Sequence, residues 1–401
     1  MKIVVAPDSF KECLPAAQVA QAIADGLNAA WAALGPHEER LEVVPVPMAD
    51  GGEGTVETVL AAAGGQRRTA TVTGPLGEPV QASFGLLADG ATAVIEMASA
   101  AGLQLVPPPQ RDPTKTTTYG VGELIRAAMD ARAKRILIGI GGSSTTDGGT
   151  GCAQALGWRF LARSGREILG PMSGGRLAEI AQIDPTGRDP RLARTDILVA
   201  CDVDNPLTGP QGAAAVYGPQ KGATPEQVRM LDEGLARLAR LTQRDVGTLV
   251  EQMPGAGAAG GLGAGLVAFC GARLCRGVES VAETVDLAGK IRGADLVITG
   301  EGRLDDQSLR GKVVCGVADI AKRLGVPTVA IAGQMSGGHE NRALSLAGWL
   351  CIIDRPMPLE QALDEAPTLL RHAGEQALRL YLLGRAGRAC GLGHARQGNG
   401  T

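Results

Sequence analysis

Short, continuous apolar runs alternate with helical patterns at the start of the chain. Runs at 2–6 and 41–46 predict buried strands, and the segments that follow them, at 15–34 and 53–63, have the apolar spacing of helices. Strands that are apolar on both faces and separated by helices are typical of a parallel sheet covered on both sides. The first part of the chain is therefore predicted to form an α/β unit.

The middle of the chain has a different pattern. Three closely spaced strands with Gly and Pro turns between them indicate an antiparallel or mixed sheet, and they lie at 71–74, 80–87 and 92–98. Alternating helices and strands then return, at 119–132, 135–140, 148–156, 197–203 and 224–240. Thr224 is expected to cap the last of these helices, with Pro225 in its first turn.

Three more apolar strands are predicted towards the end of the chain, at 296–299, 328–332 and 350–353. They resemble the N-terminal unit more than the middle. We therefore expect a fold of two α/β domains: a doubly wound, Rossmann-like parallel sheet built from both chain ends, and a mixed-sheet α/β domain inserted into it. The expected domains are 1–75 with 290–383 (part of 113–195 is assignable there too) and 76–289, followed by a Gly- and Arg-rich tail, 384–401, that is expected to be disordered.

Length and charge limit the possible functions. A chain of 401 residues is long for one core, which favours two domains. A net charge of −3 with interspersed charges argues against a nucleic-acid partner. No run approaches the roughly 20 apolar residues of a membrane helix. The eight cysteines form no Cys-x-x-Cys pair, and no signal peptide opens the sequence, so we expect buried free thiols in a reducing cytoplasm.

Four segments, far apart in sequence, place charged residues among glycines or other small residues beside an apolar run. They lie at 8–11, 49–55, 141–149 and 299–305. Glycine lets backbone N–H groups approach a ligand closely, and ligands of open α/β sheets bind beyond the carboxyl ends of the strands. Together these segments predict one composite site that holds a metal ion, a phosphate and a small anionic substrate.

Three of these segments also have a simpler interpretation when each is taken alone. Asp8 would cap the next helix, with Lys11 a solvated surface charge. Gly51 and Gly52 would form an ordinary turn instead of presenting N–H groups to an anion at a helix N-terminus. Asp147 would cap a helix. The number of small polar residues directly after a buried strand favours a functional role for 141–149.

Further candidates follow the strand at 197–201. Asp202 is a candidate base or metal ligand, and Lys221 is a candidate clamp for a carboxylate or phosphate, although both also fit turns. The segment 255–260 formally matches G-x-G-x-x-G, but no strand convincingly precedes it, so it is a weak dinucleotide signal. The four histidines show no ligand spacing, which argues against a His-based triad.

As an ordered set, these segments resemble the glycerate kinase family of type 1, the bacterial glycerate 2-kinase-like enzymes of glyoxylate and sugar-acid catabolism. The matching pieces are 8–11, 50–55, 96–103, 141–149, 201–207, 218–223, 255–263 and 299–308 with 311–312. The resemblance implies a cytoplasmic transferase that phosphorylates D-glycerate with ATP and Mg²⁺, and two α/β domains with the site between them. It favours 2-phosphoglycerate as the product. The chain departs from the family pattern at Glu12, Cys13, Ser144 and Thr146, whereas Lys11 and Asp147 are kept.

The predicted site combines acids with cations, because a triphosphate and a carboxylate bring about five negative charges that protein acids alone would repel. The predicted catalytic residues are Lys11, Asp50, Asp202 and Arg303, and the predicted Mg²⁺ ligands are Asp50, Asp202 and Glu301. Predicted contacts to substrate or phosphate are Asp8, Ser9, Gly51, Gly52, Ser143, Ser144, Thr145, Asp147, Lys221 and Glu301. Which carboxylate acts as the base stays open. Alternative functions are a kinase for another small hydroxy acid or a non-catalytic anion-binding protein.

Overall fold

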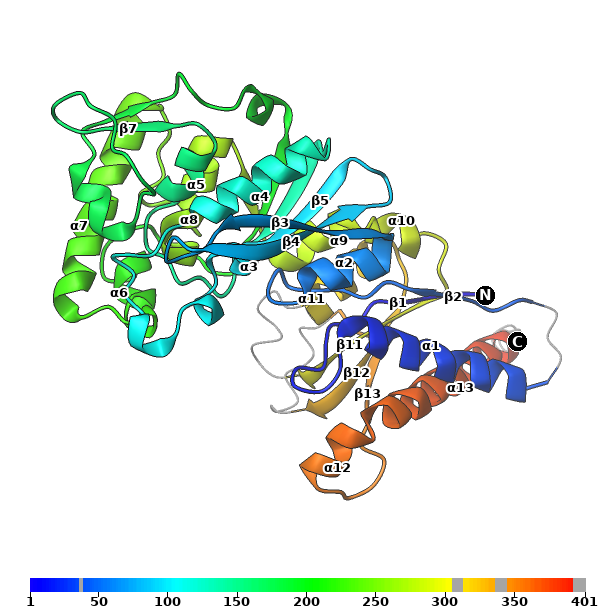
Figure 1. Cartoon of the computed structure of the whole chain (residues 1–401). Coiled ribbons are helices and arrows are strands. Elements are labelled where there is room, and N and C mark those ends of the chain that lie inside the picture. Colours follow the sequence, from blue (N-terminus) through cyan, green and yellow to red (C-terminus); the bar gives the residue numbers. More distant parts are fainter. Residues whose placement is uncertain (36–38, 305–312, 336–344, 392–401) are drawn as a thin grey trace, which may run out of the picture. The chain divides into compact units, whose positions relative to one another are not determined.

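The chain divides into two compact units. The computed structural model describes residues 1–35, 39–304, 313–335 and 345–391. Unit 1 contains Met1–Met48 and Asp286–Thr401, and unit 2 contains Ala49–Val285 (Figure 1). The boundaries therefore differ from those expected near 75 and 290, and all of 113–195 belongs to unit 2.

Unit 1 is built on a five-stranded sheet in which every neighbouring pair is parallel. Its order is β13 (Gly348–Cys351), β12 (Thr328–Met335), β11 (Leu296–Leu304), β1 (Lys2–Val5) and β2 (Glu42–Pro45). Ile3 of β1 lies opposite Leu296 of β11, so strands from the two ends of the chain are neighbours. This sheet confirms the parallel α/β unit predicted from both chain ends.

Helices cover both faces of this sheet. On one face α1 (Ala16–Ala33) packs against α13 (Ala366–Gly391), and the two run side by side in Figure 1. A Cβ on Gly26 would lie only 2.0 Å from the Arg371 carbonyl oxygen, so this close approach requires glycine. Ile331 packs on the α1 side, whereas Ala330 and Ala332 pack with α11 (Val313–Arg323), as strand alternation requires.

The C-terminal helix is longer than expected. It continues to Gly391. Unit 1 also contains two short helices, α10 (Leu287–Ile291) and α12 (Leu359–Asp364). The expectation of disorder from residue 384 therefore differs from the structure up to residue 391. Between 384 and 391, two alanines and two arginines, which are good helix formers, accompany the three glycines that suggested disorder. Residues 392–401 lie outside the described part of the chain.

Unit 2 contains a six-stranded mixed sheet. Its order is β10 (Arg273–Cys275), β9 (Asp196–Ala200), β6 (Arg135–Gly139), β5 (Thr92–Glu96), β4 (Pro79–Leu87) and β3 (Gly65–Thr73). The first four strands run parallel to one another, whereas β4 runs antiparallel to both of its neighbours, β5 and β3. This arrangement confirms the predicted mixed sheet. β3 pairs with β4 along its whole length, and this pairing explains why the sequence boundary near 75 is too late.

Both faces of the unit 2 sheet are buried at its central strands. Ile95 and Ile136 share a core with Leu124 of α4 (Tyr119–Asp130). The alternate residues Val94 and Leu137 are equally buried and face the other way, where α2 (Thr55–Ala63) and α9 (Gly277–Thr284) contact the sheet. The remaining helices include α3 (Ala98–Ala101), α5 (Thr150–Ala155), α6 (Ala213–Tyr217) and α8 (Ala258–Cys270).

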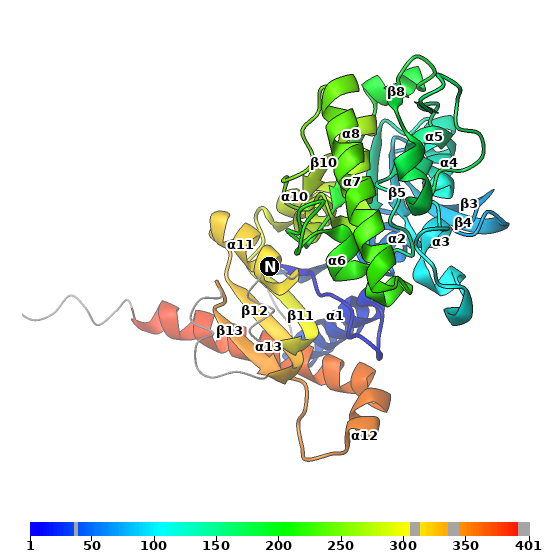
Figure 2. The ribbon, with the colours of Figure 1, turned by 90° about the vertical axis from the view of Figure 1, so that its left-hand side faces the viewer.

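The long helix α7 (Pro225–Asp245) begins as predicted. Thr224 accepts a hydrogen bond from the Gln227 backbone, and the Gln227 side chain accepts one from the Thr224 backbone. This is a capping box. Figure 2 shows α7 beside α8 in unit 2. Outside the sheet, β7 (Arg159–Leu161) and β8 (Gln182–Asp184) form an antiparallel ribbon.

None of the helices in the described ranges has the combination of length and apolar character that is needed to cross a bilayer.

Candidate active site

A cavity of about 420 Å³ opens in unit 2 beyond the carboxyl ends of β6 and β9. Four loops line it: Asp50–Gly52, the segment after β6 through Ser143, the segment after β9 through Val203, and the turn that contains Lys221. Because β6 and β9 are parallel neighbours, the loops after them meet at one edge of the sheet. The cavity therefore joins two of the four predicted segments, 49–55 and 141–149, with the further candidates Asp202 and Lys221.

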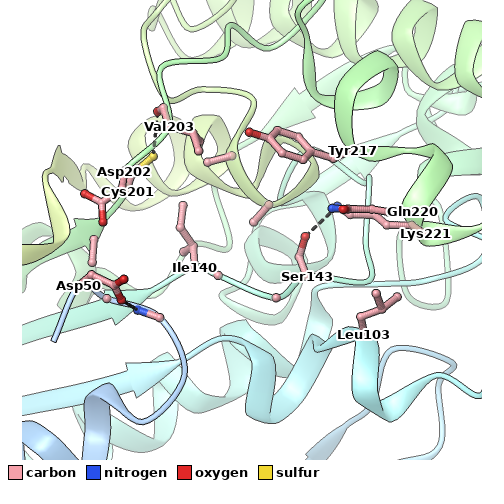
Figure 3. Close-up of a pocket in the computed structure, with 17 residues that line it drawn as sticks. Asp50, Leu103, Ile140, Ser143, Cys201, Asp202, Val203, Tyr217, Gln220 and Lys221 are labelled. Atoms are coloured by element: carbon pink, nitrogen blue, oxygen red, sulfur yellow. Dashed lines mark hydrogen bonds between the residues drawn. The ribbon is translucent and has the colours of Figure 1, made fainter. Parts of the chain in front are cut away.

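The acidic end of the cavity contains Asp50 and Asp202 (Figure 3). Asp50 Oδ1 accepts a hydrogen bond of 3.0 Å from the Gly52 backbone, and Asp202 Oδ1 accepts one of 2.8 Å from Gly277 at the start of α9. Burial raises the pKa of Asp202, the Gly277 N–H opposes this effect, and the nearby Asp50 carboxylate adds to the increase. Two carboxylates that repel each other in one cavity form a natural site for a cation or a proton.

The Asp50 loop is held tightly against the sheet. Gly51 has φ +86°, and a Cβ there would lie 2.4 Å from the Ala200 Cβ. On the other side, a Cβ on Gly277 would lie 1.7 Å from the Asp50 carbonyl oxygen. Only glycine fits at both positions, which fixes Asp50 next to Asp202.

The opposite end of the cavity contains Lys221 and Ser143 (Figure 3). The Lys221 side chain is 1 % exposed, and its Nζ donates hydrogen bonds of 2.7 Å to Ser143 Oγ and 2.6 Å to the Thr145 carbonyl oxygen. Burial lowers the pKa of Lys221 to about 7, and the charge of Asp147 opposes this shift. The cavity thus holds an amine that can change its charge near neutral pH.

This end of the cavity presents hydrogen-bond donors. An ammonium group has three N–H donors, and Lys221 uses two of them within the protein. Ser143 Oγ accepts a hydrogen bond from Lys221, so the Ser143 hydroxyl can donate its proton to a different acceptor. In the described part of the chain, the backbone N–H groups of Gly141, Gly142 and Ser143 donate to no backbone carbonyl. Several donors close together are suited to bind a carboxylate or a phosphate.

Sequence reasoning missed several residues that form the walls. Leu103 and Ile140 provide apolar surface, and Tyr217 provides an aromatic ring whose hydroxyl donates a 2.7 Å hydrogen bond to Asn205 Oδ1. Ala259, with φ +53°, lies where the formal G-x-G-x-x-G match ends. No strand precedes that match, so it is not a dinucleotide fingerprint. The small-residue segment 212–223 was a usable signal for Tyr217.

Three predicted contacts lie behind the cavity wall. The Asp147 carboxylate is fully buried and accepts hydrogen bonds from the backbone N–H groups of Thr118, Gly149 and Gly151 and from the Thr118 hydroxyl. Burial raises its pKa against these bonds. The Asp147 carboxylate therefore caps the N-terminal ends of α4 and α5, as in the simpler interpretation of this segment as a helix cap. Ser144 donates to the Ala101 carbonyl oxygen, and Thr145 reaches the cavity only through its carbonyl contact with Lys221.

The remaining predicted residues belong to unit 1, where two of the loops meet at the ends of β1 and β11. The Asp8 backbone donates to the Gly300 carbonyl oxygen at 2.8 Å, and Asp8 Oδ1 accepts from the Ser9 backbone at 2.6 Å. Glu301 is buried, whereas Lys11 and Arg303 are exposed. The segment 305–312 lies outside the described residues. Roles for these five residues remain predictions.

The arrangement of acids limits the kind of metal site. Among the residues that the structure describes, no three His, Cys, Asp or Glu side chains come together to hold an ion. Mg²⁺, however, is commonly held by one or two carboxylates together with substrate phosphates and water. Asp50 and Asp202 supply hard oxygen donors of this kind, so the residues present fit a Mg²⁺ ion that binds with a phosphate.

These features define a class: an α/β protein with a site for a small polar anion at the end of a sheet. A family model described as the glycerate kinase family matches residues 3–382. The chain is 50% identical over 369 residues to a glycerate kinase of Bacillus subtilis, across 91% of this chain and 94% of that protein. It is also 50% identical over 336 residues to the glycerate 2-kinase of Escherichia coli K12, across 84% of this chain and 86% of that protein.

A solved structure agrees with these relatives. The crystal structure assigned to a glycerate kinase 2 from Salmonella typhimurium LT2 matches with a TM-score of 0.86 and 48% identity, across 96% of this chain and 99% of that one. The chain belongs to the glycerate kinase family, and it is therefore an enzyme of the phosphotransferase class.

Proposed function

We propose that this protein transfers the γ-phosphoryl group of ATP to the 2-hydroxyl of D-glycerate and forms 2-phosphoglycerate. The observation that carries the proposal is the polarity of the unit 2 cavity, with donors around Lys221 at one end and the carboxylates of Asp50 and Asp202 at the other. The choice of the 2-hydroxyl follows the relative from Escherichia coli, which is named a glycerate 2-kinase.

The two ends of the cavity suit the two ends of a hydroxy acid. The glycerate carboxylate is proposed to accept hydrogen bonds from Lys221 Nζ, Ser143 Oγ and the adjacent backbone N–H groups. Charge-assisted bonds of this kind are stronger than neutral ones. The hydroxyl groups would then face Asp50 and Asp202, and the walls formed by Leu103 and Ile140 would limit the size of the substrate.

The chemical step needs an acceptor for the hydroxyl proton. In the proposed reaction the hydroxyl oxygen forms a bond to the γ-phosphorus, the bond from that phosphorus to the ADP oxygen breaks, and the proton passes to a carboxylate. Asp202 is the preferred acceptor, because burial and the Asp50 charge raise its pKa and make it a stronger base than an exposed aspartate. Phosphoryl transfer otherwise depends mainly on positioning and on neutralising charge.

Mg²⁺ would supply charge neutralisation between the phosphates and the acids. Asp50 is the residue of unit 2 that would hold it, which leaves Asp202 to accept the proton. In unit 1, Asp8, Ser9 and Glu301 are proposed to bind phosphate or metal, and the exposed cations Lys11 and Arg303 are proposed to neutralise phosphate charge.

A coupled assay of ADP release tests the proposal. Purified protein with Mg²⁺ and ATP is supplied with D-glycerate, L-glycerate and a panel of other small hydroxy acids, and phosphorus NMR identifies the product. We expect ADP release that depends on D-glycerate and a 2-phosphate product. Turnover of another hydroxy acid alone would support a kinase for that acid, and binding without ADP release would refute the proposed reaction.

A further inference from the structure

Glu96 is a buried acid that the proposed reaction does not use. It is the last residue of β5, and its Oε1 accepts a hydrogen bond of 2.7 Å from the Val56 backbone N–H, in the first turn of α2. The nearby Gly54 backbone N–H also favours the charged form of this carboxylate and so lowers its pKa. Gly54 occupies the N-cap position of α2 and has no side chain to satisfy these groups. Glu96 therefore caps α2 from a distant part of the sequence, in the manner of an N-cap side chain.

A short series of hydrogen bonds connects this cap to Asp50. Thr55, beside Val56, donates from Oγ1 to the Gly52 carbonyl oxygen at 2.7 Å. The Gly52 N–H then donates to Asp50 Oδ1 at 3.0 Å. The position of the Asp50 carboxylate is thus linked to the first turn of α2, which Glu96 holds against the end of β5.

Glu96 itself does not line the cavity that contains Asp50 and Asp202. It lines a neighbouring cavity of about 500 Å³, and Gly51, Gly52, Gly141 and Gly142 line both. Glu96 and Asp50 therefore line different, neighbouring cavities, and the hydrogen bond from Val56 connects Glu96 to the end of the Asp50–Gly54 loop.

We propose that Glu96 is a positioning residue for the kinase reaction, which fixes the Asp50–Gly54 loop and thereby the orientation of the Asp50 carboxylate. The inference rests on the proposed function, because it assigns Asp50 a role in phosphoryl transfer. It also explains the chemistry of the α2 N-terminus. This helix end was expected to attract a ligand anion, but the protein's own carboxylate already occupies it.

The charged groups around Glu96 make its ionisation consequential. Burial raises the pKa of Glu96, the Val56 and Gly54 N–H groups oppose this effect, and the charges of Glu53 and Glu57 on the loop and α2 increase it further. Arg67 on β3, which also lines the cavity, pairs with Glu57 at 3.2 Å. Protonation of Glu96 at acid pH would weaken the cap and loosen the loop.

The test compares Glu96→Ala and Glu96→Gln with the wild type, with Glu57→Gln as the control on the same helix. We expect Glu96→Ala to lower kcat about 10- to 100-fold, with less than about a threefold change in KM for glycerate, because a misplaced Asp50 affects the chemical step more than substrate binding. Glu96→Gln keeps an acceptor oxygen and should recover part of the loss. Because glutamine does not ionise, the decrease in kcat at acid pH that protonation of Glu96 causes should also be absent from this variant. Glu57→Gln should leave kcat within about twofold.

A double-mutant cycle separates positioning from a merely structural role. In an Asp50→Asn background, Glu96→Ala should cost less than about threefold in kcat, since the group that it orients is already disabled. A full, multiplicative loss in that background, or unchanged kcat in Glu96→Ala, would overturn the proposal. If Glu96→Ala does not fold, Glu96→Gln takes its place in the same cycle.

Amide hydrogen exchange provides a readout that does not depend on turnover. Both Glu96 variants should accelerate exchange at Gly54 and Val56 without a matching change in the sheet. A wild type without glycerate-dependent ADP release would refute the proposed function, whereas unchanged exchange at these two amides would refute the positioning role by itself.

Discussion

Lys221 offers the sharpest test of the cavity's electrostatics. Lys221→Met keeps the length and apolar stem of the side chain but removes its charge and its bonds to Ser143 and Thr145. The folded protein holds this lysine at a pKa of about 7, below its ordinary value of 10.5, because burial disfavours the ammonium form. The unfolded chain therefore binds more protons than the folded chain between about pH 7 and pH 10, and stability should rise with pH across that range.

The magnitude follows from the shift. Each pKa unit corresponds to about 1.4 kcal/mol, so the lowered pKa of Lys221 reduces the free energy of unfolding by about 5 kcal/mol well below pH 7. This cost is about 2 kcal/mol smaller at pH 9 than at pH 7. The substitution removes this cost but leaves the Thr145 carbonyl without its partner, which costs about 1–3 kcal/mol. We therefore expect Lys221→Met to be as stable as the wild type or more stable at pH 7, and to lose that advantage by pH 9.

Urea unfolding at pH 7, 8 and 9 measures this difference. The chain has three tryptophans, so a Trp31→Phe, Trp349→Phe background leaves the buried Trp158 to report on unit 2. Turnover should fall about 10²- to 10³-fold in the same variant, because a charged contact to substrate is lost. Lys322→Met, at an exposed position on α11, is the control. A stability difference between wild type and Lys221→Met that stays constant within about 0.5 kcal/mol from pH 7 to pH 9 would refute the reasoning.

Three further outcomes are expected. Asp202→Asn should lower kcat by at least about 10²-fold while the thermal melt stays within a few degrees, and the His372→Ala control should change neither; near-native turnover would remove Asp202 from the reaction. Asp147→Asn should destabilise unit 2 by about 2–4 kcal/mol in urea, because four donors bond to the two carboxylate oxygens and the amide group keeps only one of those oxygens. A chain truncated after Val285 lacks β11, β12 and β13 and should not form unit 1; protected amides in β1 would contradict this.

The sequence predicted the architecture better than the details of the site. Buried strands such as β1 and β6 were predictable because both faces of a parallel sheet are apolar. β3 was predicted only in part, because it is an edge strand that is exposed on both sides over its first half, where it carries Arg67 and Arg68. Edge strands have no continuous apolar run to detect.

The candidate site was predictable as a set of loops but not residue by residue. The loops after the parallel neighbours β6 and β9 bring Ser143 and Asp202 to one cavity, as such loops should. Asp50 and Lys221 reach the same cavity from segments that follow β2 of the other sheet and α6. Asp147 has the same local sequence character but lies behind the wall, because the depth of a side chain depends on which helix ends pack against it. Sequence spacing alone contains no information about that depth.

The pairing of β1 with β11 has a consequence for how the chain folds during synthesis. Ile3 pairs with Val43 on one side and with Leu296 on the other, so one of the two neighbours of the N-terminal strand emerges from the ribosome long after it. Closing so long a loop is entropically modest, since each doubling of loop length costs only about 0.6 kcal/mol, but it is slow and leaves an apolar strand exposed meanwhile. Unit 2 has its own core and all six strands of its sheet within Ala49–Val285. Its earlier folding would replace the long flexible loop by a compact body, so unit 1 should be the last part of the molecule to fold and the part most dependent on protection from aggregation.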